Sequence, residues 1–170
     1  MTPPAAHALI AELSAAGVSR GTLVGVSTAP AIGTGLASGA QQWALAAPDS
    51  IALIAAIEAE LQPRWVWWGR PVPELFVASD VRPTACWDVG AVHQLLFGGA
   101  RPTGAAAWAA VHDLPATGVP ATGQLDLLGE HGDDTGDADQ PVRPDGYLRP
   151  EWVSGGWRRD PDRLAAWAGV

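Results

Sequence analysis

Lysine is absent from the sequence, and cysteine occurs once, as Cys86. All ten basic residues are arginine, against 18 acidic residues, and the formal net charge is −8. This balance argues against an extended nucleic-acid-binding surface, because contacts to phosphates need clustered cations. A single cysteine excludes an intrachain disulfide and a cysteine-based zinc site. A single cysteine is compatible with a protein of the reducing cytoplasm.

Long apolar segments are also missing. No apolar run reaches the roughly 18 residues that a membrane-spanning helix requires. The N-terminal Met-Thr-Pro-Pro has neither the basic segment nor the apolar run of a secretory signal peptide. We therefore expect a cytoplasmic protein that does not bind membranes.

Aromatic residues other than tryptophan are scarce, since the chain has two phenylalanines and one tyrosine but nine tryptophans. Apolar residues make up 48% of the 170 residues, yet alanine supplies much of that fraction. Few large aliphatic side chains remain to fill a core. We expect the indole rings to do much of the packing, because each can bury a large area.

Short apolar runs predict a series of strands. The clearest is residues 64–68, Arg-Trp-Val-Trp-Trp, whose large side chains indicate burial on both faces of a parallel or mixed sheet. Residues 29–39 contain Pro30 and three glycines, which predicts a turn or hairpin connection. Weaker strand signals lie at residues 22–27, 42–46 and 81–86.

Helical segments separate these strands. Apolar spacing, alanine content and flanking Gly, Pro or Asp predict helices at residues 5–16, 51–61, 71–79, 87–97, 103–112 and 160–167. In the helix at residues 87–97 we expect four side chains to face inward, namely Val89, Val92, Leu95 and Leu96.

The order of these elements predicts one α/β domain in three sections. Residues 1–112 form an α/β core, and residues 113–150 form an irregular Pro/Gly/Asp-rich segment that is acidic at residues 130–139. Residues 151–170 form a C-terminal helical segment that completes the domain. A ribonuclease-H-like mixed sheet flanked by helices fits this order, as do several doubly wound folds.

Residue types that often carry chemistry are scattered. Asp88 begins a predicted helix, where its carboxylate would cap the N-terminus. Cys86 has no evident partner, and we expect a buried, unreactive thiol. His93 and His112 fit half-buried structural positions on helices. No metal-binding spacing exists among the four histidines, His7, His93, His112 and His131.

Two further patterns resemble sites only in part. The acidic residues at 133–139 have the composition of a calcium loop but not its spacing or its terminal glutamate, so an acidic linker explains them better. Gly33-Thr-Gly35 lacks the Gly-Lys-Ser/Thr that completes a phosphate-binding loop. No serine has the surroundings of a nucleophile elbow.

An ordered series of segments resembles a known family. Arg64-Trp-Val-Trp-Trp, Val81-Arg-Pro-Thr-Ala-Cys-Trp-Asp-Val-Gly-Ala-Val-His-Gln-Leu-Leu and Ala107-Trp-Ala-Ala-Val-His-Asp-Leu look like the N-terminal part of family A DNA polymerase-like proteins of high-GC bacteria. Those proteins are bifunctional 3′-5′ exonuclease/DNA polymerases. Residues 141–152 and 160–167 fit the same region. The polymerase part would follow Val170, so we expect a fragment or a shortened relative without polymerase activity.

The resemblance implies where catalytic carboxylates would lie. Exonucleases of this fold bind two divalent ions with several acids, among them an Asp-x-Glu pair on the first strand. Ser27 and Ala29 stand at that pair, and neither is an adequate ligand for a hard cation. Glu74 is a candidate remnant of the middle acid, although a solvated helix position explains it as well. Asp160 or Asp162 is a candidate remnant of the last acid.

Three functions are compatible with these observations. The first is a degenerate, inactive 3′-5′ exonuclease-like domain that binds no metal. Associated with a family A DNA polymerase in replication or repair, it would have a structural role or contact DNA or protein weakly. The second is an active Mg²⁺- or Mn²⁺-dependent exonuclease with its acids elsewhere, which predicts three or more carboxylates around one cleft. The third is a stand-alone protein-interaction module, which the net charge and exposed tryptophans would suit.

Overall fold

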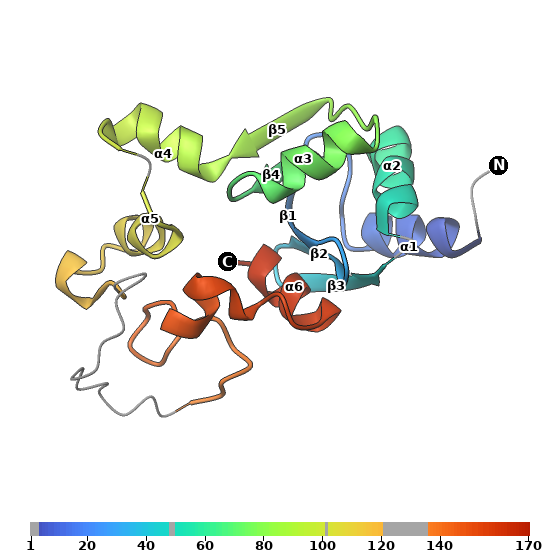
Figure 1. Cartoon of the computed structure of the whole chain (residues 1–170). Helices are drawn as coiled ribbons and strands as arrows, with labels where there is room; N and C mark the ends of the chain where they lie inside the picture. Colours follow the sequence, from blue (N-terminus) through green and yellow to red (C-terminus); the bar gives the residue numbers. More distant parts are fainter. Residues whose placement is uncertain (1–3, 48–49, 101, 121–135) are drawn as a thin grey trace.

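The computed structural model describes residues 4–47, 50–100, 102–120 and 136–170 (Figure 1). Its strands are β1 (Leu23–Ala29), β2 (Gly33–Ser38), β3 (Gln41–Ala46), β4 (Arg64–Trp67) and β5 (Ala85–Asp88). Its α-helices are α1 (Pro4–Ala15), α2 (Ser50–Leu61), α3 (Pro71–Ala78), α4 (Val89–Phe97), α5 (Gly104–Val111) and α6 (Pro161–Ala168). A 3-10 turn, η1 (Ala116–Gly118), follows α5, and a π-type turn, η2 (Trp152–Gly156), precedes α6.

The strands form one mixed sheet in the order β3-β2-β1-β4-β5. β1, β4 and β5 run parallel to one another, and β2 is antiparallel to both of its neighbours. Helix α2 connects β3 to β4, and α3 connects β4 to β5. The chain is therefore α/β, with a five-stranded mixed sheet flanked by helices that is consistent with the predicted ribonuclease-H-like arrangement.

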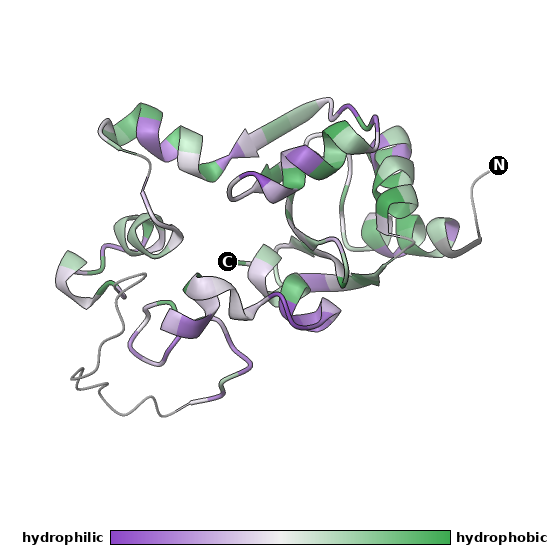
Figure 2. Ribbon diagram, in the orientation of Figure 1, coloured by the Kyte–Doolittle hydropathy of each residue, from purple (hydrophilic) through white to green (hydrophobic). Residues whose placement is uncertain are grey.

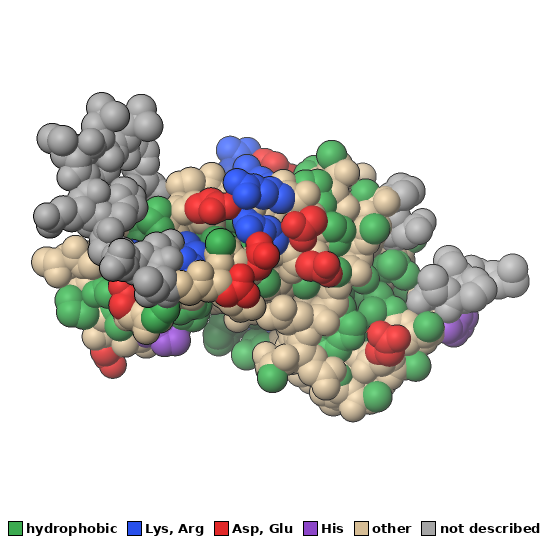
Figure 3. All heavy atoms as spheres, turned by 90° about the horizontal axis from the view of Figure 1, so that it is seen from below, with side chains coloured by type: hydrophobic (Ala, Val, Ile, Leu, Met, Phe, Trp, Pro, Cys, Tyr) green, Lys and Arg blue, Asp and Glu red, His purple; other side chains and the backbone are tan. Residues whose placement is uncertain are grey.

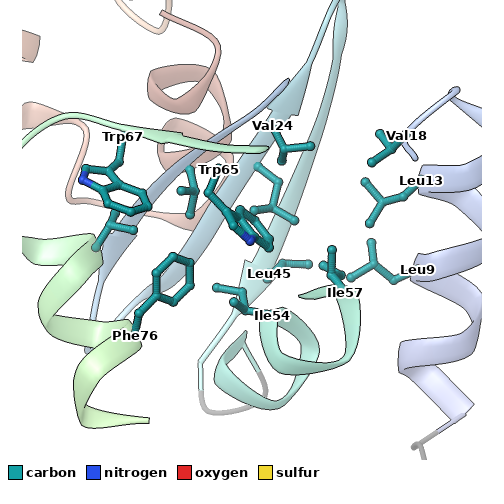
Figure 4. Packing of buried hydrophobic residues seen from close by; sticks show 13 residues of the cluster. Leu9, Leu13, Val18, Val24, Leu45, Ile54, Ile57, Trp65, Trp67 and Phe76 are labelled. Atoms are coloured by element: carbon teal, nitrogen blue, oxygen red, sulfur yellow. The ribbon is translucent and has the colours of Figure 1, made fainter. Parts of the chain in front are cut away.

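The main hydrophobic core lies between one face of the sheet and helices α1, α2 and α3 (Figure 4). Trp65 is fully buried there, and the ring of Phe76 meets both Trp65 and Trp67 edge-on, at centroid distances of 5.6 and 5.7 Å. Such edge-to-face pairs add stability beyond the buried area. The expected packing role of tryptophan is confirmed here and in a second core cluster that contains Trp152 and Trp157.

Burial of β4 differs from the sequence prediction. Trp65 and Trp67 are buried, but Arg64 and Val66, on the opposite face of the same strand, are only partly covered. The prediction of burial on both faces is therefore wrong for β4. The second helical layer explains the difference. Helix α6 packs mainly over β1, β2 and β3, so the side chains of β4 on that face are only partly covered.

Glycines let α6 lie directly on the sheet. A β-carbon at Gly25 of β1 would lie 2.0 Å from the carbonyl oxygen of Ala168, and one at Gly35 of β2 would lie 2.0 Å from the carbonyl carbon of Leu164. Only a residue without a side chain permits backbones to approach this closely. The predicted turn at residues 29–39 is therefore wrong for Gly33–Ser38, which form a strand that uses glycine for contact with α6.

Helix α4 extends away from the sheet beyond β5 (Figure 1). Val89 and Val92 are half-buried, but Leu95 is 85% exposed and Leu96 is 72% exposed. The prediction that all four side chains face inward is thus wrong for the last two. The short edge strand β5 places α4 outside the two packed layers, and the hydrophobic residues of α4 are visible in Figure 2.

The segment before α6 is held to that helix by charge. The Arg163 side chain is only 11% exposed and pairs with Asp139 at 2.6 Å and with Glu151 at 3.1 Å, while Arg159 pairs with Glu151 at 3.0 Å. The hydrogen bond that Arg163 donates to the Asp139 carboxylate raises the pKa of Arg163 above its ordinary value. Viewed from below, arginine side chains are bordered by acidic ones on this part of the surface (Figure 3).

None of the helices in the described part of the chain is long and apolar enough to cross a membrane.

Candidate functional site

The two positions that the resemblance singles out lie near the end of β1. Alternation along this strand directs Val24 and Val26 into the core under α1 to α3 and directs Ser27 and Ala29 to the opposite face. Ser27 and Ala29 therefore share one face, as an Asp-x-Glu pair would. That face is the one that α6 covers.

Packing with α6 occupies this position. The hydroxyl of Ser27 is buried and donates a hydrogen bond of 2.7 Å to the backbone carbonyl of Leu164. Ala29 is 7% exposed and packs with Trp152, Trp157 and Leu164 in the second core cluster. A buried hydroxyl is satisfied by a helix carbonyl here, so this part of β1 acts as a support for α6.

The three candidate acidic remnants do not gather at this face. Glu74 lies on α3, on the opposite side of the sheet, where its carboxylate is 62% exposed and pairs with Arg70 at 3.0 Å. Asp160 caps α6, because its carboxylate accepts a hydrogen bond of 2.8 Å from the backbone N–H of Arg163. Asp162 is exposed in the first turn of α6, where a negative charge suits the helix dipole.

The residues at β1 do not fit a divalent metal ion. Ser27 and Ala29 bring no carboxylate, and the Ser27 hydroxyl is already bonded to α6. Within residues 4–47, 50–100, 102–120 and 136–170, no group of three or more His, Cys, Asp or Glu side chains is placed to hold a metal. The predicted carboxylate cluster of an active exonuclease thus finds no counterpart among these residues.

The acidic segment is only partly within the described residues. Asp133 and Asp134 lie outside them, as does His131. Asp137 accepts a hydrogen bond of 2.9 Å from the backbone N–H of Asp139, whose own carboxylate pairs with Arg163. These two aspartates therefore have local structural partners.

A second ion pair, between Arg143 and Asp145, lies in the turn that follows this segment. Partial burial alone would raise the pKa of Asp145, but hydrogen bonds from the side chain of Arg143 and from the backbone N–H of Tyr147 lower it below its ordinary value.

Other residues with predicted roles show mixed outcomes. Asp88 caps α4 as predicted, since its carboxylate accepts a hydrogen bond of 3.2 Å from the N–H of Ala91. Cys86 is exposed, so the prediction of a buried thiol is wrong, because the edge strand β5 leaves that side uncovered. His93 is half-buried beside Phe97 as predicted. His112 is exposed, and its ring is tilted against that of Trp108, with 3.9 Å between the ring centroids.

Sequence reasoning missed one buried acid, Glu58 of α2. Its carboxylate accepts a hydrogen bond of 2.7 Å from the indole N–H of Trp65, and two more of 2.7 Å from the backbone N–H and the hydroxyl of Thr84. A signal was present, because Glu58 lies four residues after Ile54 on the apolar face of the helix. This carboxylate fixes β4 to the segment that leads into β5.

Comparison of the chain with protein-family models, curated proteins and solved structures finds no match in any of the three.

Proposed function

We propose that this chain is a non-catalytic, 3′-5′ exonuclease-like domain of the ribonuclease-H type. Its role is to support a family A DNA polymerase module, or to contact DNA or protein weakly, during replication or repair. The observation that carries the proposal is the contact between Ser27 and Leu164, which places a packed helix against β1 where metal-binding acids would have to stand. The sheet order is compatible with this origin.

The sequence resemblance supplies the link to a polymerase, and the structure supports only the inactive part of the proposal. A two-metal site needs converging carboxylates with room for two ions and a scissile phosphate. The face of β1 that would have to supply these carboxylates also bears Gly25. The backbone of α6 occupies the space in which a β-carbon of this residue would lie. Helix α6 therefore occupies the part of this face that Gly25 and the Ser27 hydroxyl contact.

A nuclease assay tests the inactive state. Labelled single-stranded DNA is incubated with the purified chain and Mg²⁺ or Mn²⁺, and product lengths are compared with those of a protein-free control. We expect no shortening. Glu74→Ala and Glu60→Ala are prepared in parallel, because both residues are exposed helix glutamates and only Glu74 is a candidate remnant. Cleavage that Glu74→Ala abolishes and Glu60→Ala retains would overturn the proposal.

A second function, a stand-alone protein-interaction module, is favoured by exposed apolar residues at the end of α4. Leu95, Leu96 and Phe97 are 85, 72 and 69% exposed. Size-exclusion chromatography with and without single-stranded DNA separates the two functions. A complex with DNA that dissociates in salt supports the exonuclease-like domain. Self-association that rises with protein concentration and is unchanged by DNA supports the interaction module.

A further inference from the structure

A cavity of about 480 Å³ lies between the sheet and the outlying helices. Its lining residues come from β1, β2 and β4, from α4 and α5, and from the end of α6, all of which are drawn in Figure 1. Sites for small molecules commonly have volumes of about 300–1,000 Å³. The cavity is therefore large enough for a ligand with a single ring or with two fused rings.

The lining of this cavity is mostly apolar and includes several aromatic rings. Its ring-bearing side chains are Trp67, Trp68, Trp108, Trp157, Trp167, Phe97, His93 and His112. No Arg, Asp or Glu side chain is among the described residues that line it. An anionic ligand would lose its hydration without an arginine in the described lining to pair with it. A flat uncharged ligand would gain stacking and edge contacts with the rings.

Two of the residues that line the cavity each have a buried side-chain nitrogen with no hydrogen-bond partner among the described residues. These atoms are Nε1 of Trp67 and Nδ1 of His93. Trp67 is 7% exposed, and Figure 4 shows its nitrogen on the ring edge turned away from Phe76 and the core. Buried polar groups almost always have a partner, so this pair of atoms indicates one that the described residues do not supply.

The chemistry of these atoms defines the missing partner. The indole N–H of Trp67 can only donate, so it needs an acceptor oxygen or nitrogen. The imidazole of His93 can donate or accept at Nδ1, depending on its tautomer. We infer that the cavity binds a small, uncharged aromatic molecule with a carbonyl-type oxygen, which accepts the hydrogen bond of Trp67 while His93 offers a second polar contact. This inference does not depend on the proposed function.

Single-stranded DNA is the main competing occupant, because bases also stack on tryptophan. Each phosphate would need a cation, however. Arg158 lines a separate hollow of about 180 Å³ that adjoins the cavity, and there it lies over the ring of Trp157 at 4.6 Å. The absence of arginine from the described lining therefore favours a small molecule over a polyanion, and DNA becomes an outcome of the test.

The test uses two probes of matched shape, acetonaphthone and isopropenylnaphthalene, of which only the first has a carbonyl oxygen. Binding is measured by titration calorimetry and by tryptophan fluorescence. We expect both to bind the full chain at one site, with acetonaphthone tighter by about tenfold, the contribution of one hydrogen bond. Trp67→Phe keeps an aromatic ring but removes the N–H, and should abolish this difference.

Two larger substitutions locate the site. Val92→Trp fills the cavity from α4 and should abolish binding of both probes. Val77→Trp adds the same side chain to α3 at a position that is 82% exposed and outside the cavity, so it should leave both affinities unchanged. Circular dichroism checks that each variant is folded. If Trp67→Phe does not fold, the binding site is tested with His93→Phe and with the two variants Val92→Trp and Val77→Trp.

Several results would overturn the inference. They are the absence of saturable binding, equal affinities of the two probes for the unchanged chain, and binding that survives Val92→Trp. Displacement of acetonaphthone by an oligothymidylate would assign the cavity to single-stranded DNA instead.

Discussion

At the scale of single residues, Glu58 shows how one buried acid connects parts of the chain. Its 8% exposed carboxylate lies between Trp65 of β4 and Thr84, which precedes β5. All three groups that it contacts are donors, so the charge is satisfied by hydrogen bonds and needs no cation. Loss of the carboxylate would leave a buried indole N–H and a backbone N–H without an acceptor.

Replacing this acid should be costly. We expect Glu58→Ala to lower the free energy of unfolding by about 3 kcal/mol, because each buried donor that loses its partner costs roughly 1–3 kcal/mol. Glu60→Ala, an exposed change on the same helix, should cost less than about 0.5 kcal/mol. Urea denaturation followed by tryptophan fluorescence measures both. Equal losses for the two variants would show that the hydrogen bonds of Glu58 contribute little.

At the scale of elements, local sequence patterns were sufficient where burial is periodic. The run at β4 and the helical spacing of α2 predicted both elements within a residue or two of their bounds. The strand β2 was missed because its glycines, at Gly33 and Gly35, are the residues that usually mark turns. Their purpose depends on α6, which is more than a hundred residues away, and no local pattern contains that information.

The contact between β2 and α6 should not tolerate even one methyl group. Gly35→Ala places a β-carbon 2.0 Å from the backbone of Leu164, so α6 must move away from the sheet. We expect a loss of about 1–3 kcal/mol in the free energy of unfolding, as for other overpacked sites. Gly104→Ala is the matched control, because its nearest neighbour would be 3.7 Å away, at the start of α5. It should be neutral or slightly stabilising. A neutral Gly35→Ala would contradict the described packing of α6.

At the scale of the whole molecule, the sequence predicted the fold class but not the packing of α6 on the candidate site. Ser27 could be identified as a position without a carboxylate, yet its bond to Leu164 joins residues 137 apart in the chain. Asp160 could have been identified as a helix cap from the proline that follows it. The position of Glu74 across the sheet from Ser27 depends on topology, which periodicity alone does not determine.

The C-terminal segment completes the domain through Arg163, which gives a prediction for the molecule as a whole. Arg163→Met keeps an apolar stem over Trp152 but removes the bonds to Asp139, Glu151 and the carbonyl of Gly156. The freed carboxylates can become hydrated, so we expect a loss of only about 1–2 kcal/mol. The loss should be concentrated in residues 136–150, because the sheet has its own core. Hydrogen exchange should therefore accelerate in that segment while β1 and β4 stay protected. Arg159→Met, which removes one exposed pair with Glu151, should leave the pattern unchanged. Faster exchange spread evenly over the sheet would mean instead that Arg163 stabilises the domain as one unit.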